Sequence, residues 1–169
     1  ALSGEKKRRL YALKNTLNHH SRLNPHYAYS SSFGDKETQE MSLISIPSIF
    51  YGSSIEKGSI RLKYYVSGTL LAEAADTKRD GRLIQTSGSE DNITIGDVVG
   101  VALYDEGFLM ITSSARLSSH AEAYIPSDST DYNTSWKYFA VTSSNAGASS
   151  SSFSIEFNGV NYVETITMM

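Results

Sequence analysis

The chain has 169 residues, no cysteine and a formal net charge of −3. A chain of this length forms about one domain. Without cysteine it has no disulfide, no thiolate metal ligand and no cysteine nucleophile. The small net charge creates no strong field of one sign, which disfavours nucleic acid or an anionic membrane as the main partner.

The first residues do not read as a targeting segment. A basic cluster at residues 6–9 is followed by a short apolar stretch, but Lys14 and Asn15 interrupt that stretch. A secretory signal needs about 7 to 15 apolar residues in a row, and a membrane-spanning helix about 18. We therefore expect a soluble chain. Since it begins with Ala1 rather than Met, we expect a processed chain or a piece of a longer protein.

The N-terminal region predicts one helix followed by an extended arm. Leu10, Leu13 and Leu17 recur at helical spacing, and Pro25 prevents continuation of the helix. Residues 22–36 are rich in turn formers and predict a loop.

From residue 41 onward the pattern changes to strands. Residues 59–66 alternate apolar and polar side chains, which predicts a half-buried strand. Residues 69–75 and 82–86 flank a turn that ends in Asp-Gly, and they predict a hairpin. Residues 98–104 and 108–112 predict a second hairpin, whose continuous apolar arms indicate burial on both faces.

The remaining segments are predicted with weaker patterns. We expect a short strand at 93–95, a surface crossing over 113–134 and a strand at 136–142. A third hairpin is expected from residue 153 to 167, around the type I′ dipeptide Asn158-Gly159.

These elements predict a mainly β fold: an antiparallel β-sandwich or barrel-like domain with one N-terminal helix and arm. We expect residues 1–40 to form the helix and extended arm, and residues 41–169 to form the antiparallel β domain.

No residue pattern predicts catalysis, a metal site or a cofactor. His19, His20 and His26 are close in sequence, but no carboxylate lies at helical spacing beside them. The serines occur in runs, which is typical of solvated loops. Asp76 and Asp80 lack the spacing of a calcium loop and predict a hairpin tip instead. The eleven tyrosines modestly favour a role in interaction.

A longer motif carries a family resemblance. Residues 45–60 read SIPSIFYGSSIEKGSI. Together with residues 10–17, 25–30, 80–83 and 98–108, this segment resembles virion structural proteins of tailed bacteriophages, above all those of marine, T4-like phages. The resemblance covers most of the chain and includes no catalytic residue. It leaves open whether the chain belongs to a neck, a tail, a fibre or a capsid decoration.

The resemblance implies a non-enzymatic structural component of a virion, assembled in the host cytoplasm. We expect a symmetric homo-oligomer that also binds other virion proteins, with no cofactor and no membrane contact. The N-terminal arm is expected to supply much of the interface. The residues expected there are Leu10, Leu13, Leu17, Tyr27 and Tyr29.

Two alternatives stay open at this point. The chain could be a carbohydrate-binding, adhesive module of a fibre tip that recognises a host-surface glycan. That alternative predicts that tyrosines and Trp136 lie exposed on one face. The other alternative is a virion-associated glycan hydrolase, which requires two carboxylates across a cleft.

Overall fold

The computed structural model describes residues 4–88, 90, 93–125, 133–143 and 151–163. The helical segments are α1 (Gly4–His20) and the single 3₁₀ turns η1 (Pro25–Tyr27), η2 (Ser48–Phe50) and η3 (Trp136–Tyr138). The strands are β1 (Ser30–Ser31), β2 (Gly34–Asp35), β3 (Ser42–Ser45), β4 (Ser54–Ile55), β5 (Arg61–Val66), β6 (Thr69–Ala75), β7 (Arg82–Gly88), β8 (Val98–Leu103), β9 (Phe108–Ile111), β10 (Arg116–Ala121), β11 (Tyr124–Ile125), β12 (Asn133–Ser135), β13 (Thr142–Ser143), β14 (Ser151–Glu156) and β15 (Gly159–Val160).

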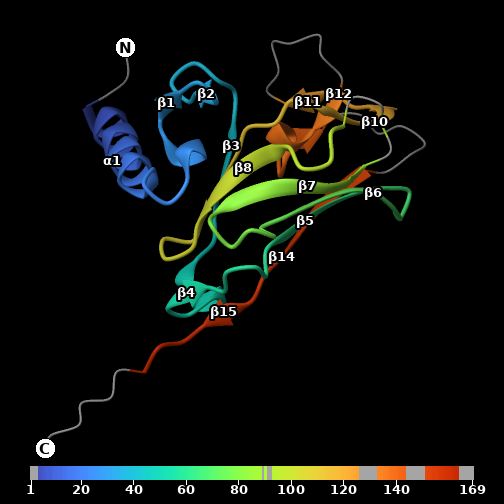
Figure 1. Ribbon diagram of the computed structural model, residues 1–169. Helices are drawn as coiled ribbons and strands as arrows, with labels where there is room; N and C mark the ends of the chain where they lie inside the picture. Colours follow the sequence, from blue (N-terminus) through green and yellow to red (C-terminus); the bar gives the residue numbers. More distant parts are fainter. Residues whose placement is uncertain (1–3, 89, 91–92, 126–132, 144–150, 164–169) are drawn as a thin grey trace, which may run out of the picture.

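A curled seven-stranded sheet forms the centre of the molecule (Figure 1). Its strand order is β14-β5-β6-β7-β8-β9-β3, and every neighbouring pair is antiparallel. The expected mainly β, antiparallel and barrel-like class with one N-terminal helix is therefore confirmed. Strands β3 and β14 are the two edges of this sheet.

The two strongest sequence patterns are confirmed. In β5, Leu62 and Tyr64 are buried and alternate with more accessible residues, as a half-buried strand requires. Strands β8 and β9 form the expected hairpin, and nearly all of their residues are buried. Both faces of this hairpin are covered, which explains its continuous apolar sequence.

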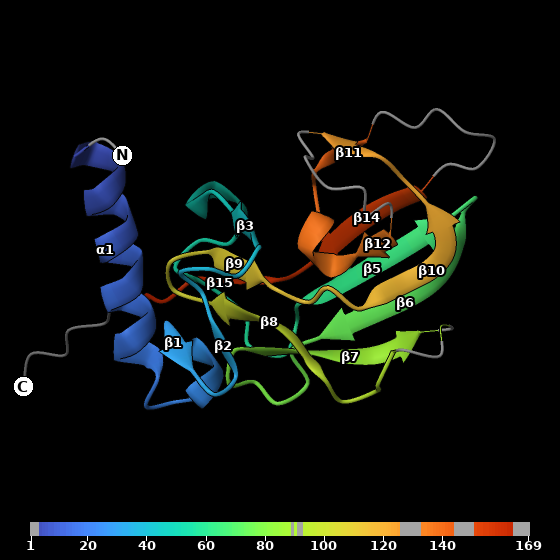
Figure 2. The ribbon, with the colours of Figure 1, turned by 90° about the horizontal axis from the view of Figure 1, so that it is seen from above.

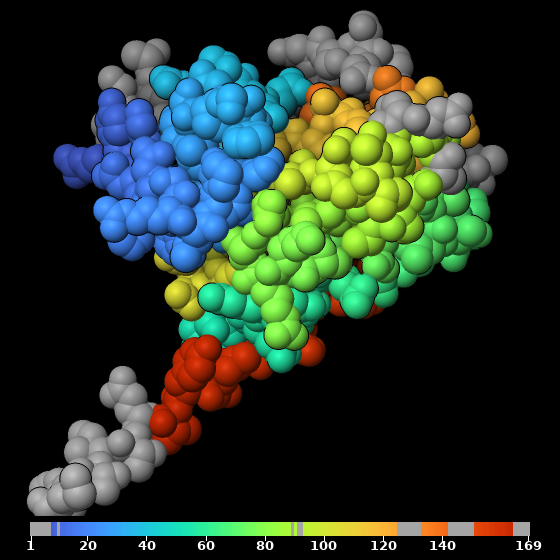
Figure 3. Space-filling view, in the orientation of Figure 1, coloured from blue at the N-terminus to red at the C-terminus, as the bar shows by residue number. Residues whose placement is uncertain are grey.

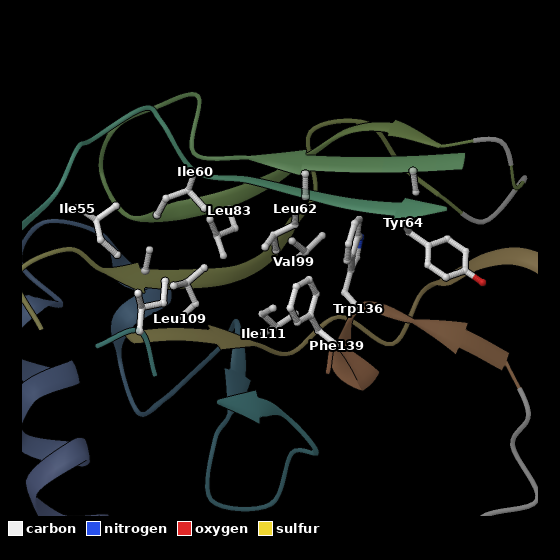
Figure 4. Close-up of a cluster of buried hydrophobic side chains, with 14 of the residues drawn as sticks. Ile55, Ile60, Leu62, Tyr64, Leu83, Val99, Leu109, Ile111, Trp136 and Phe139 are labelled. Atoms are coloured by element: carbon white, nitrogen blue, oxygen red, sulfur yellow. The ribbon is translucent and has the colours of Figure 1, made fainter. Parts of the chain in front are cut away.

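The larger core lies against one face of the sheet. Figure 4 shows Trp136 and Phe139, from η3 and the residue after it, packed against Leu62, Val99 and Ile111 of the sheet. The Trp136 indole N–H donates a hydrogen bond of 2.6 Å to Gln85 Oε1, so the buried polar atom has a partner.

A smaller core lies on the opposite face, where the N-terminal arm covers β8 and β9. Leu17, Tyr27 and Tyr29 of the arm are buried there against Val101 and Met110 of the hairpin. Figure 2 shows α1 and the β1–β2 hairpin beside β8 and β9. The described part of the arm is therefore packed on the sheet of its own chain.

Two weaker predictions are wrong. Residues 93–95 form a loop, since the strand-like apolar pattern there finds no partner strand among the described residues. The expected surface crossing over 113–134 instead contributes β10, β11 and β12 in its described parts. Leu117 of β10 is fully buried in the larger core, so this segment covers the sheet rather than crossing the surface.

The expected strand at 136–142 and the third hairpin are also wrong. Trp136 and Phe139 both enter the core from a 3₁₀ turn, where a spacing of three residues places side chains on the same side. Strand β14 pairs with β5, and β15 pairs with β4, so the two arms do not pair with each other. The expected residues 164–167 lie outside the described residues.

Candidate interaction surface

The structure places the five expected interface residues unevenly. Leu17, Tyr27 and Tyr29 are buried inside the chain, and Leu13 is half-buried at the edge of the same cluster. Leu10 lies in α1, and its side chain is outside what the structure describes. In this conformation three of the five side chains pack within the chain.

Buried hydrogen bonds fix the arm on the sheet. The Tyr27 hydroxyl donates to the Ala102 carbonyl of β8. Asn24 Nδ2 lies 3.5 Å from the Asp80 carbonyl, and Asn24 Oδ1 accepts a bond of 2.9 Å from the His26 N–H. These contacts connect η1 both to β8 and to the turn between β6 and β7. The bond from Tyr27 to Ala102 and the contact of Asn24 with Asp80 join residues far apart in the chain, so no local pattern predicts them.

Asp76 is the most buried carboxylate of the described residues that carry a shifted pKa. Its Oδ2 accepts hydrogen bonds from the Gly58 N–H (2.6 Å) and the Tyr104 hydroxyl (2.9 Å). Its Oδ1 accepts one from the Ile60 N–H (3.0 Å). Burial raises the pKa of Asp76 above its ordinary value, although these donors oppose the shift. Asp76 is therefore a structural junction rather than the exposed hairpin tip expected from sequence.

Two strongly exposed apolar side chains lie on the η2 turn, which follows edge strand β3 after two residues. Ile49 is 86% exposed and Phe50 is 68% exposed. Large apolar side chains that gather on a surface are typical of interaction sites, whereas a scattered one is normal. In the sequence, the SIPSIFYG motif belongs to a β-branched and aromatic run whose Pro47 predicts a strand edge or a bulge.

Backbone hydrogen bonds hold η2 in place. The N–H groups of Phe50 and Gly52 donate to the carbonyls of Pro47 (3.0 Å) and Ser48 (2.7 Å). The Ile46 N–H, just before the turn, donates to the Gly107 carbonyl (2.8 Å). The exposure of Ile49 and Phe50 is thus a consequence of a fixed backbone, and these side chains are presented in a defined orientation.

Tyr51 attaches the same turn to the larger core. It is buried in the larger core, and its ring packs against Gly107, where φ is +68°. A Cβ atom at Gly107 would overlap the Tyr51 ring, so glycine is needed for both the backbone angle and the close approach. Tyr51 is therefore held in the core while its neighbour Phe50 is exposed.

The end of the described chain lies beside η2. The Tyr162 N–H donates to Ser53 Oγ (3.0 Å), and the Ser53 N–H donates to the Val160 carbonyl (2.9 Å). Tyr162 is 70% exposed and Val163 is 87% exposed. Figure 3 shows this segment standing away from the body of the molecule.

We call these four exposed side chains the apolar end. They are Ile49, Phe50, Tyr162 and Val163.

An apolar groove lies between helix α1 and the edge of the sheet. It has a volume of about 630 Å³. Its lining residues, which together we call the α1 groove, are Arg9, Ala12, Leu13, Thr16, Leu43, Leu103, Glu106 and Phe108. Leu43 belongs to edge strand β3 and is 49% exposed. On its other side, β3 pairs with no strand among the described residues.

The side chains that could suggest catalysis meet in a different place. His120 Nε2 lies 2.9 Å from Glu122 Oε1, and the Ser151 hydroxyl donates to the same oxygen. In a catalytic triad the imidazole lies between the hydroxyl and the carboxylate. Here the carboxylate lies between the other two groups, an order that does not let the imidazole take the hydroxyl proton.

The remaining site predictions can be compared with the structure. Trp136, which the carbohydrate-binding alternative expected on an exposed face, is fully buried. His20 contacts Tyr27, and His26 contacts Phe33, with ring centres 5.6 and 4.3 Å apart. Within the described residues, no group of three or more histidine or carboxylate side chains could hold a metal ion.

Comparisons with known proteins identify no relative. No protein-family model, no curated protein and no solved structure matches this chain. Of the helices in the described part of the chain, none is long and apolar enough to cross a membrane.

Proposed function

We propose that this chain is a non-enzymatic structural component of a tailed-bacteriophage virion, assembled in the host cytoplasm with copies of itself and with other virion proteins. The observation that carries this proposal is the rigid presentation of Ile49 and Phe50 on the η2 turn. A fixed turn that exposes two large apolar side chains binds a partner with little further loss of conformational entropy.

The sequence motif contains the exposed residues of the η2 turn. The segment that resembles phage virion proteins, residues 45–60, contains η2, β4 and the exposed pair. The larger core uses Ile46, Tyr51, Ile55 and Ile60 from this segment. Ile49 and Phe50 contribute nothing comparable to the core, which supports a role for them in contacts between proteins.

The adhesive alternative predicted an exposed Trp136, and this side chain is buried. With Trp136 in the core, an exposed aromatic face would lack the one tryptophan of the chain. We therefore retain the structural role as the proposed function and treat glycan binding as a separate question for a glycan array.

Mass spectrometry of density-gradient-purified phage particles tests the proposal. We expect peptides of this chain in the particle fraction at a fixed ratio to the other virion proteins, after a high-salt wash that removes adsorbed protein. Antibodies against the chain should label particles at a regular position in electron micrographs. Absence from washed particles contradicts the proposal.

A further inference from the structure

We propose that two copies of this chain pair about a two-fold axis, with the η2 turn of each copy seated in the α1 groove of the other. This inference rests on the proposed function and names the first partner in assembly as a second copy. The occupant of the groove is the turn that carries Ile49 and Phe50.

The two surfaces have complementary shape and chemistry. The turn is convex and presents Ile49 and Phe50, whereas the groove is concave and lined largely by apolar side chains such as Leu13, Leu43 and Phe108. A volume of about 630 Å³ falls in the range of sites that enclose a ligand of drug size. It is therefore large enough to receive a pair of large side chains.

A chain cannot fill its own groove with its own turn. The hydrogen bonds from Phe50 and Gly52 to Pro47 and Ser48 fix the turn, and in that position Ile49 remains 86% exposed. Moving the turn into the groove of the same chain would break these bonds and remove Tyr51 from the core. An η2 turn that occupies the groove must therefore come from another molecule.

The turn and the groove lie next to each other, and this proximity favours a closed pair. The Ile46 N–H, just before η2, bonds the Gly107 carbonyl, whose neighbours Glu106 and Phe108 line the groove. Two complementary surfaces that share one side can satisfy each other reciprocally, as in an isologous dimer. Surfaces on opposite sides would instead produce rings or filaments.

Edge strand β3 lies between the two surfaces and fits the same arrangement. Its four residues connect to η2 through Ile46 and Pro47, and Leu43 faces the groove. A two-fold axis through this side covers the free edge of β3 in both copies. Figures 1 and 2 place α1 and the segment that ends at residue 163 toward this side too, so Tyr162 and Val163 can add contact area.

The exposed apolar side chains supply part of the contact area that a stable dimer needs. Such an interface buries about 800 Å² on each partner, and a single aromatic side chain supplies roughly 150–250 Å². Phe50 and Tyr162, with Leu43, Ile49 and Val163, provide the apolar centre of the interface. The rim would include Arg9, Thr16 and Glu106 of the groove.

Because the chain has no cysteine, single-cysteine variants can map the contact directly. We would mix the full-length Ala12→Cys and Phe50→Cys chains and treat them with a short bismaleimide. Ala12 is an exposed residue on the α1 wall of the groove. We expect mixed covalent dimers at least tenfold in excess of those from the Ala12→Cys and Ile95→Cys mixture. Ile95 is a matched control, 59% exposed on the loop before β8. Equal yields in the two mixtures overturn the proposal.

The chain that carries both Ala12→Cys and Phe50→Cys tests the symmetry. A closed two-fold pair ends at a covalent dimer, whereas a head-to-tail contact gives a ladder of trimers and larger species. A cross-link within one chain would show that the turn is not held away from its own groove. Either of these last two results overturns the proposal.

Sedimentation of the wild-type chain and the Phe50→Asp variant gives an independent measurement. We expect Phe50→Asp to raise the dimer dissociation constant at least tenfold, with an unchanged circular dichroism spectrum because Phe50 is exposed, and Ile95→Asp to leave the constant unchanged. If the chain is monomeric but present in washed particles, this inference fails and the proposed function stands. If it dimerises as described but is absent from particles, the proposed function fails and the dimer stands.

Discussion

At the residue scale, Asp76 shows how a buried charge can organise distant segments. Its carboxylate binds the N–H groups of Gly58 and Ile60, which precede β5, and the Tyr104 hydroxyl, which follows β8. The Tyr104 oxygen in turn accepts a bond of 3.1 Å from the Gly81 N–H. A buried carboxylate is tolerated where donors surround it, and each of these donors would otherwise lack a partner.

Replacement of Asp76 by asparagine should destabilise the chain although it removes a buried charge. An amide group has only one acceptor oxygen, so its NH₂ would face either the Ile60 N–H or both the Gly58 N–H and the Tyr104 hydroxyl. We expect Asp76→Asn to lower the free energy of unfolding by about 1–3 kcal/mol, the cost of leaving a buried donor unsatisfied. Urea denaturation at pH 7 measures it, with Asp105→Asn, an exposed turn residue, as the control. Equal stability of Asp76→Asn and wild type would refute this role.

The pH dependence of the same pair of proteins gives a second residue-scale prediction. Burial raises the pKa of Asp76 above its ordinary value of 3.8, so the folded chain takes up this proton at a higher pH than the unfolded chain. Uptake of this proton therefore adds a stabilising contribution that is complete below pH 3.8 and is lost as the pH rises through the raised pKa, whereas the hydrogen bonds to the carboxylate remain at pH 7. We expect the stability difference between wild type and Asp76→Asn to be larger at acid pH than at pH 7. Urea denaturation of both proteins across that range would disprove the assignment if the difference stayed constant or shrank on acidification.

At the element scale, the N-terminal arm is held to the sheet through Tyr27, and this contact depends on Gly81. Gly81 has φ of +92°, and a Cβ atom there would overlap the Tyr27 hydroxyl. Gly68 also has positive φ, +79°, but no atom lies within 4 Å of the corresponding position. A comparison of alanine variants at the two glycines therefore distinguishes the effect of backbone strain from the effect of displacing the arm.

Gly81→Ala should release the arm, whereas Gly68→Ala should not. Both variants place a side chain in the left-handed region, at a cost of about 1–2 kcal/mol. Only Gly81→Ala also pushes Tyr27 off β8. We expect trypsin to cut after the exposed Arg22 at least tenfold faster in Gly81→Ala than in Gly68→Ala, while the sheet stays intact. Equal cleavage rates in the two variants would show that Tyr27 does not hold the arm.

The element scale also shows what local sequence can predict. A strand alternates apolar and polar residues when one face is covered, and is apolar throughout when both faces are covered. The alternation in β5 and the continuous apolar sequences of β8 and β9 therefore predicted these elements correctly. The segment that begins at Trp136 has a similar alternation, but its side chains fill a space beneath the sheet from a 3₁₀ turn. Asn158-Gly159 has a hairpin composition, yet β14 extends the sheet beside β5 and buries Phe153 and Ile155 against the core. These outcomes depend on long-range pairing, which no local pattern contains.

The candidate surface was less predictable than the fold. In the sequence, Ile49 and Phe50 belong to a β-branched and aromatic run that predicts a strand, and Pro47 was the one sign of an interruption. The 3₁₀ turn that carries them is fixed by Tyr51, which packs against Gly107, a contact between residues 56 positions apart. Leu17 and Tyr27 were expected at an interface because they are large and apolar, but the same property buries them against β8 and β9.

At the scale of the whole molecule, the segments that cover the sheet determine which part of its surface stays exposed and can contact another chain. The η3 segment and β10 cover one face, and the arm covers the other face at β8 and β9. The side that carries edge strand β3, the α1 groove and the apolar end keeps exposed apolar surface. Edge strands of soluble proteins are usually short or protected, and β3 has only four residues, which limits uncontrolled pairing.

Association through this side should make the thermal stability depend on protein concentration. When a folded dimer unfolds to two chains, a tenfold increase in concentration stabilises the dimer by about 1.4 kcal/mol, or about 0.7 kcal/mol per chain. For a domain of about 150–250 residues, this corresponds to a rise in Tm of about 2 °C. For each tenfold increase in concentration, we expect a rise in Tm of about 2 °C in wild type and in Ile95→Asp, and no rise in Phe50→Asp. Calorimetry over two decades of concentration measures the Tm of each protein. A wild-type Tm that is independent of concentration, or a Phe50→Asp variant with the wild-type slope, would show that the apolar end does not mediate association of the folded chain.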